Sequence, residues 1–347
     1  MSDPPIDLRS DAHAAATEEM WEAMRAAQRG SATSSEDPSV KELQERVAGL
    51  LGKEAGLWVP TCGMANLVAL LTIAPRGSTV VLEASSHLLT SEAMGIEEIA
   101  GLEPWSLWAE DGRLDPVEVE EAIVETGALM LVLENTHTRA GGTVLSPELT
   151  AGLARAAQSH GAYVHLDGAR LFNAAVALGV PVSALAATAN TVAVSLNKGL
   201  CAPMGAILAG RTQVIELAHE TLRRLGGASV HKAGIAAAAA LVALDTLVER
   251  LADDHRRASE LGALLQEIPG LEVEPAEIET NIVLADVSGT ELYPHEFVEL
   301  LAKRDVLVME RDASRVRFVT HRLIGDVEIS AAAEIVAQAV AERPQTA

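Results

Sequence analysis

The chain has 347 residues, of which 49% are hydrophobic, and its formal net charge is −23, from 49 acidic and 26 basic residues. That length and apolar content predict a globular protein of about two domains, while the acidic balance, without a run of Lys or Arg, argues against nucleic acid as a partner. No apolar run approaches the roughly 18 residues of a membrane span, and no secretory leader pattern opens the chain, so we expect a cytoplasmic protein without membrane contacts. Two cysteines are too few for a disulfide framework or a zinc site, and we expect no metal.

The first 250 residues have the pattern of a large α/β domain. An extended arm and an amphipathic helix are expected within residues 7–30, and from Ser39 onward helices and strands alternate. Continuous apolar strands between helices are typical of a parallel sheet covered on both faces. We therefore predict a doubly wound, mostly parallel sheet. Its expected strands are 56–59, 79–82, 128–134, 162–167, 191–196 and 206–209, and the expected helices include 39–51, 64–73 and 147–160.

The pattern changes after a predicted long helix at 233–251 and another that ends near Ile268. Short strands at 271–273, 281–287, 306–309 and 315–320 follow closely on one another, with helices at 294–303 and 327–342. Such spacing favours a smaller C-terminal α+β domain with an antiparallel sheet. We place the boundary near residue 250, so that residues 1–250 form the arm and the large domain and residues 251–347 the small one.

Two charged residues follow strands of the predicted parallel sheet. Asp167 ends the strand 162–167, and Lys198 lies just beyond the strand 191–196. Open α/β sheets bind their ligands at the carboxyl ends of such strands. Pyridoxal phosphate chemistry needs both groups, a carboxylate that keeps the pyridine nitrogen protonated and an amine that holds the aldehyde. The pair therefore predicts pyridoxal 5'-phosphate as cofactor.

The chain contains only five lysines, so the choice of the amine is narrow. Lys41, Lys53 and Lys303 fall on or just beyond polar faces of predicted helices, where a solvated charge is the ordinary interpretation. Lys232 follows a glycine loop and stays an alternative. Lys198 follows a strand of apolar and small residues, where burial would make the amine more reactive.

Further candidates lie at the same edge of the sheet. Thr61, Cys62 and Gly63 precede an apolar helix whose first N–H groups can bind a phosphate, although a Thr there is ordinarily an N-cap. His87 and His137 each follow a strand and are candidates for a stacking group and a proton acceptor.

Arginines supply the candidate anion-binding groups. Arg170 lies three residues past Asp167, within reach of the cofactor. Arg315 and Arg317 lie on the same face of one strand, and either one can supply a bidentate guanidinium for a substrate carboxylate. The periodicity does not choose between them.

Several stretches closely resemble the low-specificity threonine aldolases. They are 7–11 (DLRSD), 134–137 (ENTH), 139–142 (RAGG), 165–174 (HLDGARLFNA), 195–200 (SLNKGL) and 317–321 (RFVTH), and the likeness covers most of the chain. The resemblance implies fold type I of the pyridoxal phosphate enzymes and an assembly of two or four identical chains with active sites at subunit interfaces. It also implies a retro-aldol activity that cleaves β-hydroxy-α-amino acids such as threonine, allo-threonine or phenylserine into glycine and an aldehyde.

Residue roles follow from the same resemblance. Lys198 would hold the cofactor, Asp167 would pair with its pyridine nitrogen, and His87 would stack on the ring. Arg170 would meet the phenolate or the carboxylate side, Ser10 and Arg317 would bind the substrate carboxylate, and His137 would lie near the β-hydroxyl. Either histidine could be the base.

The chain departs from the family pattern at three places. Thr61-Cys62-Gly63 replaces Ser-Gly-Thr, Ser34 replaces a tyrosine of the substrate pocket, and His231-Lys232 replaces Arg-Gln near the cofactor, where Lys232 or Arg224 could compensate. The missing tyrosine and the altered residues after the glycine loop leave a β-eliminating lyase or racemase as an alternative. A third interpretation is a non-catalytic ligand-sensing module of the kind fused to transcription regulators. The acidic net charge disfavours this interpretation because it opposes contact with DNA.

Overall fold

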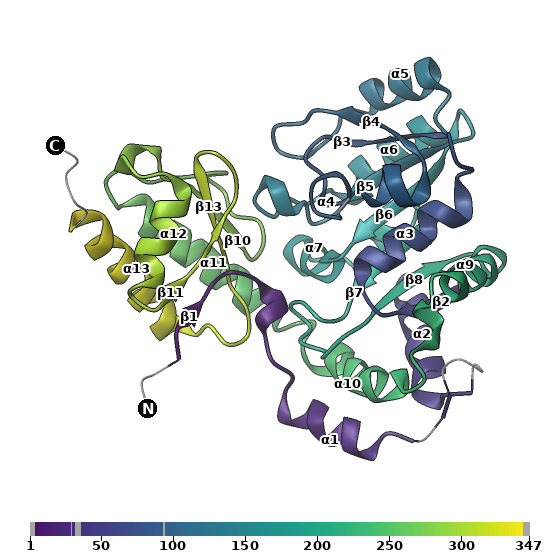
Figure 1. The fold of residues 1–347 in the computed structure, drawn as a ribbon, viewed down its shortest axis with the longest axis horizontal. Coiled ribbons are helices and arrows are strands. Elements are labelled where there is room, and N and C mark those ends of the chain that lie inside the picture. Colours follow the sequence, from purple (N-terminus) through teal and green to yellow (C-terminus); the bar gives the residue numbers. More distant parts are fainter. Residues whose placement is uncertain (1–3, 29, 32–35, 93, 343–347) are drawn as a thin grey trace.

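Within the residues that the computed structural model describes (4–28, 30–31, 36–92 and 94–342), a seven-stranded sheet forms the larger part of the molecule and a four-stranded sheet the smaller part (Figure 1). The large sheet has the order β2-β8-β7-β6-β5-β3-β4, in which β8 runs antiparallel to both neighbours and all other pairs are parallel. The predicted α/β fold with a mostly parallel sheet is confirmed. The strands are β2 (Ala55–Val59), β3 (Thr79–Glu83), β4 (Glu103–Leu107), β5 (Met130–Glu134), β6 (Tyr163–Gly168), β7 (Thr191–Ser195) and β8 (Ala206–Gly210).

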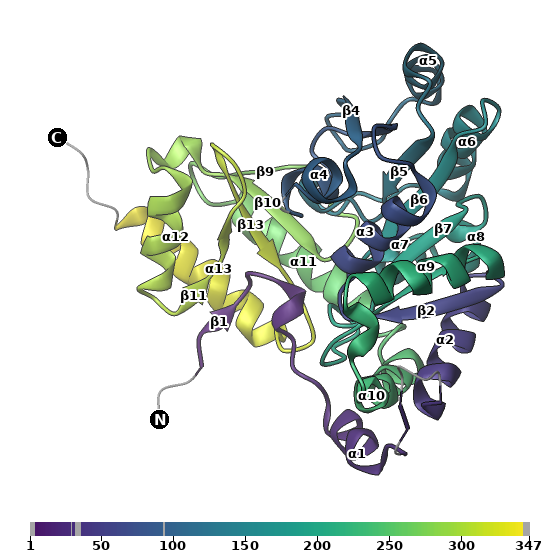
Figure 2. The ribbon, with the colours of Figure 1, turned by 45° about the vertical axis from the view of Figure 1, so that its right-hand side comes forward.

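Consecutive side chains of the central strands enter cores on opposite faces of the sheet. In β3, Val81 packs into one core, whereas Val80 and Leu82 pack into the other. One face is covered by α3 and α9 and the other by α2, α5, α6 and α10, and Figure 2 shows α9 and α10 on opposite sides of β2. The helices of this part are α1 (Glu18–Ala26), α2 (Pro38–Leu50), α3 (Cys62–Ile73), α4 (His87–Thr90), α5 (Pro116–Thr126), α6 (Pro147–Gln158), α7 (Leu171–Leu178), α8 (Val182–Ala186), α9 (Thr212–Arg224) and α10 (Ala233–Thr246).

Local sequence fixes where several of these helices begin. Asp37, Asp115 and Ser146 each cap a helix by accepting a backbone N–H of its first turn, and each is followed by a proline at the first helical position. Proline is preferred there because its fixed φ suits a helix and its missing N–H would have no partner. No helix among the described residues has the length and apolarity to cross a bilayer.

The smaller part is an antiparallel sheet of order β12-β13-β10-β9. Three helices cover it and share a core centred on Phe297 and Phe318, both fully buried. The predicted α+β pattern with an antiparallel sheet is confirmed. The elements are α11 (Leu251–Gln266), β9 (Glu272–Val273), β10 (Ile282–Asp286), α12 (Pro294–Ala302), β11 (Val306–Leu307), β12 (Met309–Glu310), β13 (Arg315–Val319) and α13 (Asp326–Ala341).

The N-terminal arm crosses between the two parts (Figure 1). Its strand β1 (Ile6–Asp7) pairs in parallel with β11, and Leu8 is buried in the core of the smaller part, whereas α1 packs on α10 of the larger part. The arm thereby carries Ser10 and Asp11 to the junction of the two parts. The division of the chain at residue 250 stays a prediction.

Two local predictions differ from the structure, and one strand was not predicted. The helix expected at 233–251 ends at Thr246, and α11 starts at Leu251; neither a glycine nor a proline marks this break, and Leu247 and Leu251 are buried on both sides of it. The strand expected at 306–309 is split between β11 and β12, which pair with different partners. The edge strand β4 has no apolar pattern because most of its side chains are exposed.

Candidate active site

A cavity of about 290 Å³, which we call the central cavity, opens where the ends of the parallel strands meet the arm and β13. It brings together five predicted site residues from distant parts of the sequence. These are Ser10, His87, Arg170, Lys198 and Arg317, and the cavity is completed by Ser91, Thr138, Arg139, Met309, Glu310 and Arg311.

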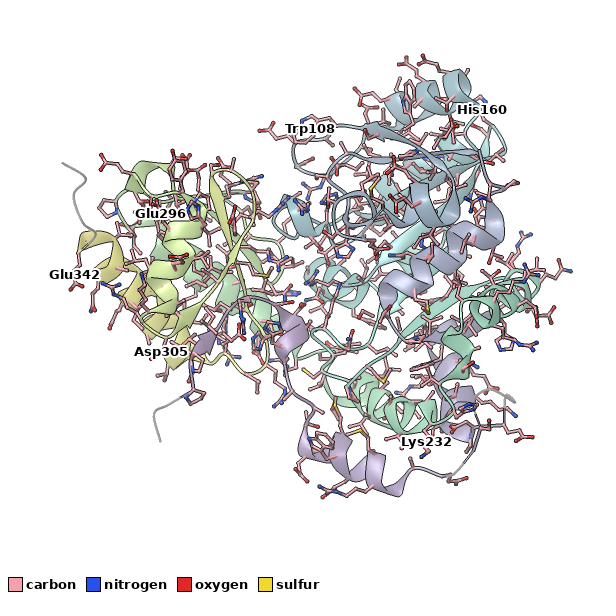
Figure 3. The ribbon with its side chains drawn as sticks, viewed as in Figure 1. Trp108, His160, Lys232, Glu296, Asp305 and Glu342 are labelled. Atoms are coloured by element: carbon pink, nitrogen blue, oxygen red, sulfur yellow. The ribbon has the colours of Figure 1, made fainter. Side chains whose placement is uncertain are left out.

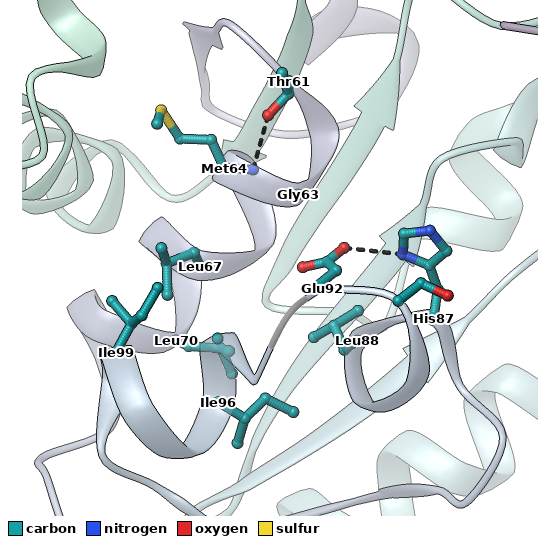
Figure 4. Close-up of a pocket in the computed structure, with 12 residues that line it drawn as sticks. Thr61, Gly63, Met64, Leu67, Leu70, His87, Leu88, Glu92, Ile96 and Ile99 are labelled. Atoms are coloured by element: carbon teal, nitrogen blue, oxygen red, sulfur yellow. Dashed lines mark hydrogen bonds and ion pairs between the residues drawn. The ribbon is translucent and has the colours of Figure 1, made fainter.

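A second cavity of about 390 Å³, the neighbouring cavity, lies between α3 and the segment that begins at His87. Thr61 and Gly63 line it, and His87 and Ser91 line both cavities. Figure 4 shows Thr61 and Glu92 at its polar end and leucine and isoleucine side chains along the rest. The predicted phosphate-binding loop and the predicted stacking histidine therefore belong to one continuous site.

Asp167 is buried at the end of β6, beside Glu134 of β5. Its carboxylate accepts hydrogen bonds from Asn66 Nδ2 at 3.0 Å and from the Ala169 backbone N–H at 3.0 Å, and the Cys62 thiol lies 3.9 Å away. Burial, and then the like charges of Glu134 and Glu92, raise the pKa of Asp167 to about 6. Among the described residues this carboxylate forms no ion pair, although the more distant charges of Lys198 and His87 oppose the rise of its pKa. A protonated pyridine nitrogen is the partner that the predicted cofactor would provide.

Lys198 lies just beyond β7 and lines the central cavity. Burial, and then the charge of Arg170, lower the pKa of its amine. Among the described residues no carboxylate oxygen lies within 4.0 Å of its Nζ, so the amine is not held in an ion pair. Lys232 is exposed at the start of α10 (Figure 3), outside both cavities. The geometry therefore favours Lys198 over Lys232.

The two histidines occupy different environments. His87 is fixed by a 3.0 Å contact of Nδ1 with Glu92 and by its backbone N–H, which donates to Glu134 at 2.7 Å. His137 is 1% exposed and lines neither cavity; its Nε2 is 3.0 Å from Glu83. Burial alone would lower the pKa of His137, but the charges of Glu134 and Glu83 outweigh that effect and raise it. Only His87 of this pair faces the space that a substrate would fill.

Arg170 is the centre of a buried ion pair. Its Nε and Nη2 donate to Asp11 at 2.7 and 2.8 Å, and its Nη1 donates to Thr138 at 2.9 Å. Ser10, next to Asp11, accepts the backbone N–H of Ala12 and lines the cavity.

Arg317 carries no ion pair of this kind. Its Nη2 donates to the backbone carbonyl of Arg9 at 3.0 Å, and its buried Nε has no partner among the described residues. Arg315 points to Asp312, with Nε and Nη2 at 2.9 and 2.7 Å from that carboxylate, and it does not line the cavity. The structure therefore places Arg317, and not Arg315, where a ligand carboxylate could reach it.

The first turn of α3 fits the phosphate-binding role. Thr61 is its N-cap and accepts the backbone N–H of Met64 at 3.1 Å, which is the ordinary capping role of such a residue (Figure 4). The N–H groups of Cys62 and Gly63 lie in the same turn, where no intrahelical carbonyl is available to them. These donors and the helix dipole suit a phosphate.

Sequence reasoning gave no role to Asn66, Glu92, Asp11 or Glu134. Asn66 joins Asp167 to Glu92, with Nδ2 at 3.0 Å from each carboxylate, and Asp11 neutralises Arg170. Asp11 lies inside one of the family-like stretches, but Glu92 falls in an irregular segment with no periodic signal. Ser34, where the family has a tyrosine, lies outside the described residues.

Comparison with known proteins agrees with this geometry. Residues 7–288 match the beta-eliminating lyase family. The chain belongs to this family. It is 37% identical over 329 residues to low-specificity L-threonine aldolase 1 of Arabidopsis thaliana, covering 92% of each chain. It is 34% identical over 322 residues to the low specificity L-threonine aldolase of Escherichia coli O157:H7, covering 91% of this chain and 93% of the relative.

The fold agrees as well. The structure of Leishmania major threonine aldolase superposes with a TM-score of 0.82 at 18% identity, covering 97% of this chain and all 100% of that one. The resemblance inferred from the sequence is therefore confirmed, and with it fold type I. The family depends on pyridoxal 5'-phosphate, so this is the cofactor. Asp167 and Lys198, neither of which forms an ion pair within the part of the chain that the structure describes, fit its ring nitrogen and its aldehyde, and the N-terminus of α3 fits its phosphate.

Proposed function

We propose that the protein cleaves β-hydroxy-α-amino acids, of the threonine, allo-threonine or phenylserine type, to glycine and an aldehyde by breaking the Cα–Cβ bond. One observation carries the proposal. Lys198 and Arg317 come from different sheets, yet they line one cavity together with His87. An amine to hold the cofactor, a guanidinium for the α-carboxylate and an imidazole for a proton are the groups that this cleavage needs.

When bound, the cofactor supplies an aromatic ring that accepts the electron pair of the broken bond. Asp167 would hold a proton on the ring nitrogen of the bound cofactor, and Asn66 fixes that carboxylate by a hydrogen bond. Arg317 binds the α-carboxylate with the help of the Ser10 hydroxyl. Arg170, fixed by Asp11, would offer its charge to the cofactor's phenolate or to the carboxylate side of the substrate. These contacts orient the substrate so that the bond to be broken is the one activated.

The proton of the β-hydroxyl goes to His87 in this proposal. Glu92 accepts from or donates to Nδ1 and thereby fixes the ring, and Nε2 has no protein partner among the described residues. Either Nε2 or a water bound to it takes the proton. His137 lies outside the cavity, and its contact with Glu83 holds that carboxylate in position. The alternative is that His137 itself takes the proton.

The test of the proposal is product analysis. The purified protein, loaded with pyridoxal phosphate, is mixed with L-threonine, L-allo-threonine and phenylserine, and aldehyde and glycine are quantified. We expect both products in equal amounts from at least one of the three. No aldehyde from any of them would contradict the proposal.

A second candidate activity is β-elimination or racemisation by the same cofactor. The description of the matching family names β-elimination, and the missing tyrosine at Ser34 and the altered residues His231 and Lys232 are the sequence changes that motivate this alternative. Pyruvate or ammonia from serine or cysteine analogues, without aldehyde from the hydroxy amino acids, would establish this activity instead.

We also propose a cytoplasmic homodimer or homotetramer with active sites at subunit interfaces. The neighbouring cavity supports an interface at this place, because apolar side chains line it beside the phosphate-binding turn and Ile99 at its edge is 48% exposed. Light scattering on the purified protein would give a mass of two or four chains; a monomer would contradict the proposal.

A further inference from the structure

The central cavity holds more positive charge than the cleavage of threonine requires. Arg170 is neutralised by Asp11, and Arg317 has the α-carboxylate as its proposed partner. Arg139 and Arg311 line the same cavity and have no role in that reaction. They come from different parts of the fold, Arg139 from the turn at Thr138–Ala140 after β5 and Arg311 from the residue that follows β12.

The Arg311 guanidinium is held against the backbone of Arg139, and among the described residues neither guanidinium forms an ion pair; the nearby carboxylate of Asp312 is paired with Arg315. Arg311 donates through Nη2 and Nε to the backbone carbonyl of Arg139, at 2.8 and 3.3 Å. Within the described ranges no carboxylate oxygen lies within 4.0 Å of the side-chain nitrogens of either residue. Burial, and then the charge of Arg139, lower the pKa of Arg311 to about 10, so it stays charged at neutral pH.

The other anionic groups of the site do not neutralise the positive charge of Arg139 and Arg311. Glu310 lines the cavity, but it is an exposed residue of an edge strand, and within the described residues its carboxylate does not come within 4.0 Å of a side-chain nitrogen of either arginine. The phosphate of the cofactor would bind at Thr61 and Gly63, which line the neighbouring cavity and not this one. Holding half-buried like charges near one another costs free energy, which a bound anion recovers. The α-carboxylate of a substrate forms one bidentate pair with a guanidinium, and Arg317 is the proposed partner for that pair.

We propose that Arg139 and Arg311 bind a second carboxylate, carried by the β-substituent of the substrate, so that the preferred substrates are β-hydroxy-α-amino dicarboxylic acids. The smallest is 3-hydroxyaspartate. The inference rests on the proposed aldolase function and names its substrate class. The Cα–Cβ bond breaks, the β-hydroxyl proton leaves, Cβ becomes the carbonyl carbon of glyoxylate, and Cα takes a proton to give glycine. Atoms and electrons balance without an oxidant or a reductant.

The test compares 3-hydroxyaspartate with its neutral isostere 3-hydroxyasparagine. We expect the cofactor-loaded protein to give a kcat/KM ratio of at least about tenfold in favour of the acid, because a charge-assisted contact contributes about 1.5–3 kcal/mol. Arg139→Gln and Arg311→Gln should each lower this ratio about tenfold. Arg304→Gln is the matched control, since Arg304 pairs with Glu342 on the surface of the same part of the molecule, and it should leave the ratio as it is.

A binding measurement that needs no turnover accompanies the kinetics. L-Aspartate and L-asparagine lack the β-hydroxyl, so calorimetric titration gives their dissociation constants directly. L-Aspartate should bind about tenfold more tightly than L-asparagine, and Arg311→Gln should remove the difference.

The outcomes separate this inference from the function on which it rests. Aldehyde from threonine together with equal constants for acid and amide would overturn the dicarboxylate preference and leave the aldolase function standing. A preference that survives both arginine substitutions would also overturn it. No aldehyde from any hydroxy amino acid, together with tight binding of L-aspartate lost in Arg311→Gln, would refute the aldolase and retain the second anion site.

Discussion

Replacing Asp11 by Asn should destabilise the protein far more than removal of an exposed ion pair. Asp11 is 0% exposed, accepts two hydrogen bonds from Arg170 and a third from Asn281 at 3.2 Å, and Arg170 is itself buried. The substitution leaves a buried guanidinium without its counter-charge. Breaking a buried pair in this way typically costs about 3–5 kcal/mol. The low end, about 3 kcal/mol, is expected here because Asn keeps one acceptor and Thr138 keeps its bond to Arg170.

The dependence on pH follows from the same pair. Burial alone would raise the pKa of Asp11, but the charge and hydrogen bonds of Arg170 outweigh it and hold the pKa below its usual range. The carboxylate of Asp11 therefore binds a proton more readily in the unfolded chain than in the folded one. The ion pair contributes fully to the free energy of unfolding above a pH of about 4, and its contribution decreases as the pH falls below that value. The difference in the free energy of unfolding between the wild-type protein and Asp11→Asn should therefore become smaller at acidic pH.

Urea unfolding of the two proteins at several pH values measures this loss. Asp7→Asn is the matched control, because Asp7 pairs with Arg9 at a partly exposed position and should contribute no more than about 1 kcal/mol. Equal losses for the two variants at pH 7, or a difference that grows in acid, would refute the reasoning.

Three further predictions concern the site. His87→Asn should lower kcat for aldehyde release about 100-fold or more, as for the loss of a general base, and His137→Asn should lower it less; the reverse order would assign the base to His137. Asp167→Asn should stabilise the cofactor-free protein at pH 8 by up to about 3 kcal/mol, because the raised pKa of Asp167, about 6, means that its charged form is disfavoured by folding. This gain should vanish in urea unfolding below a pH of about 4, and a loss of stability at pH 8 would count against it. Arg317→Gln should raise KM for the amino acid about 10- to 100-fold, whereas Arg315→Gln, which loses contacts with Asp312 and Glu274 outside the central cavity, should not; initial rates over a range of substrate concentrations distinguish them.

Patterns local to one strand predicted most of the large sheet. Apolar runs between helices gave the strands that carry Asp167 and Lys198, and the register of β6 between β5 and β7 then fixes Asp167 beside Glu134. The edge strand β4 and the break between α10 and α11 were missed, because an exposed strand has no apolar run and no breaker residue marks that break.

The sequence pattern did not predict contacts between segments that are far apart in the chain. Nothing in residues 7–11 indicates that they lie against β11 and deliver Asp11 to Arg170, 159 positions away. Periodicity did not separate Arg315 from Arg317, since the choice depends on where Asp312 and the carbonyl of Arg9 lie in space. The resemblance to threonine aldolases selected Arg317, whose side chain lines the central cavity, and its role as the carboxylate-binding residue stays a prediction.

The central claim is that Lys198 holds the cofactor. Reduction of the cofactor-loaded protein with borohydride, followed by proteolysis and mass spectrometry, locates the attached group directly. We predict one modified lysine per chain, Lys198. Modification of Lys232, of Lys53 or of no lysine at all would contradict the assignment.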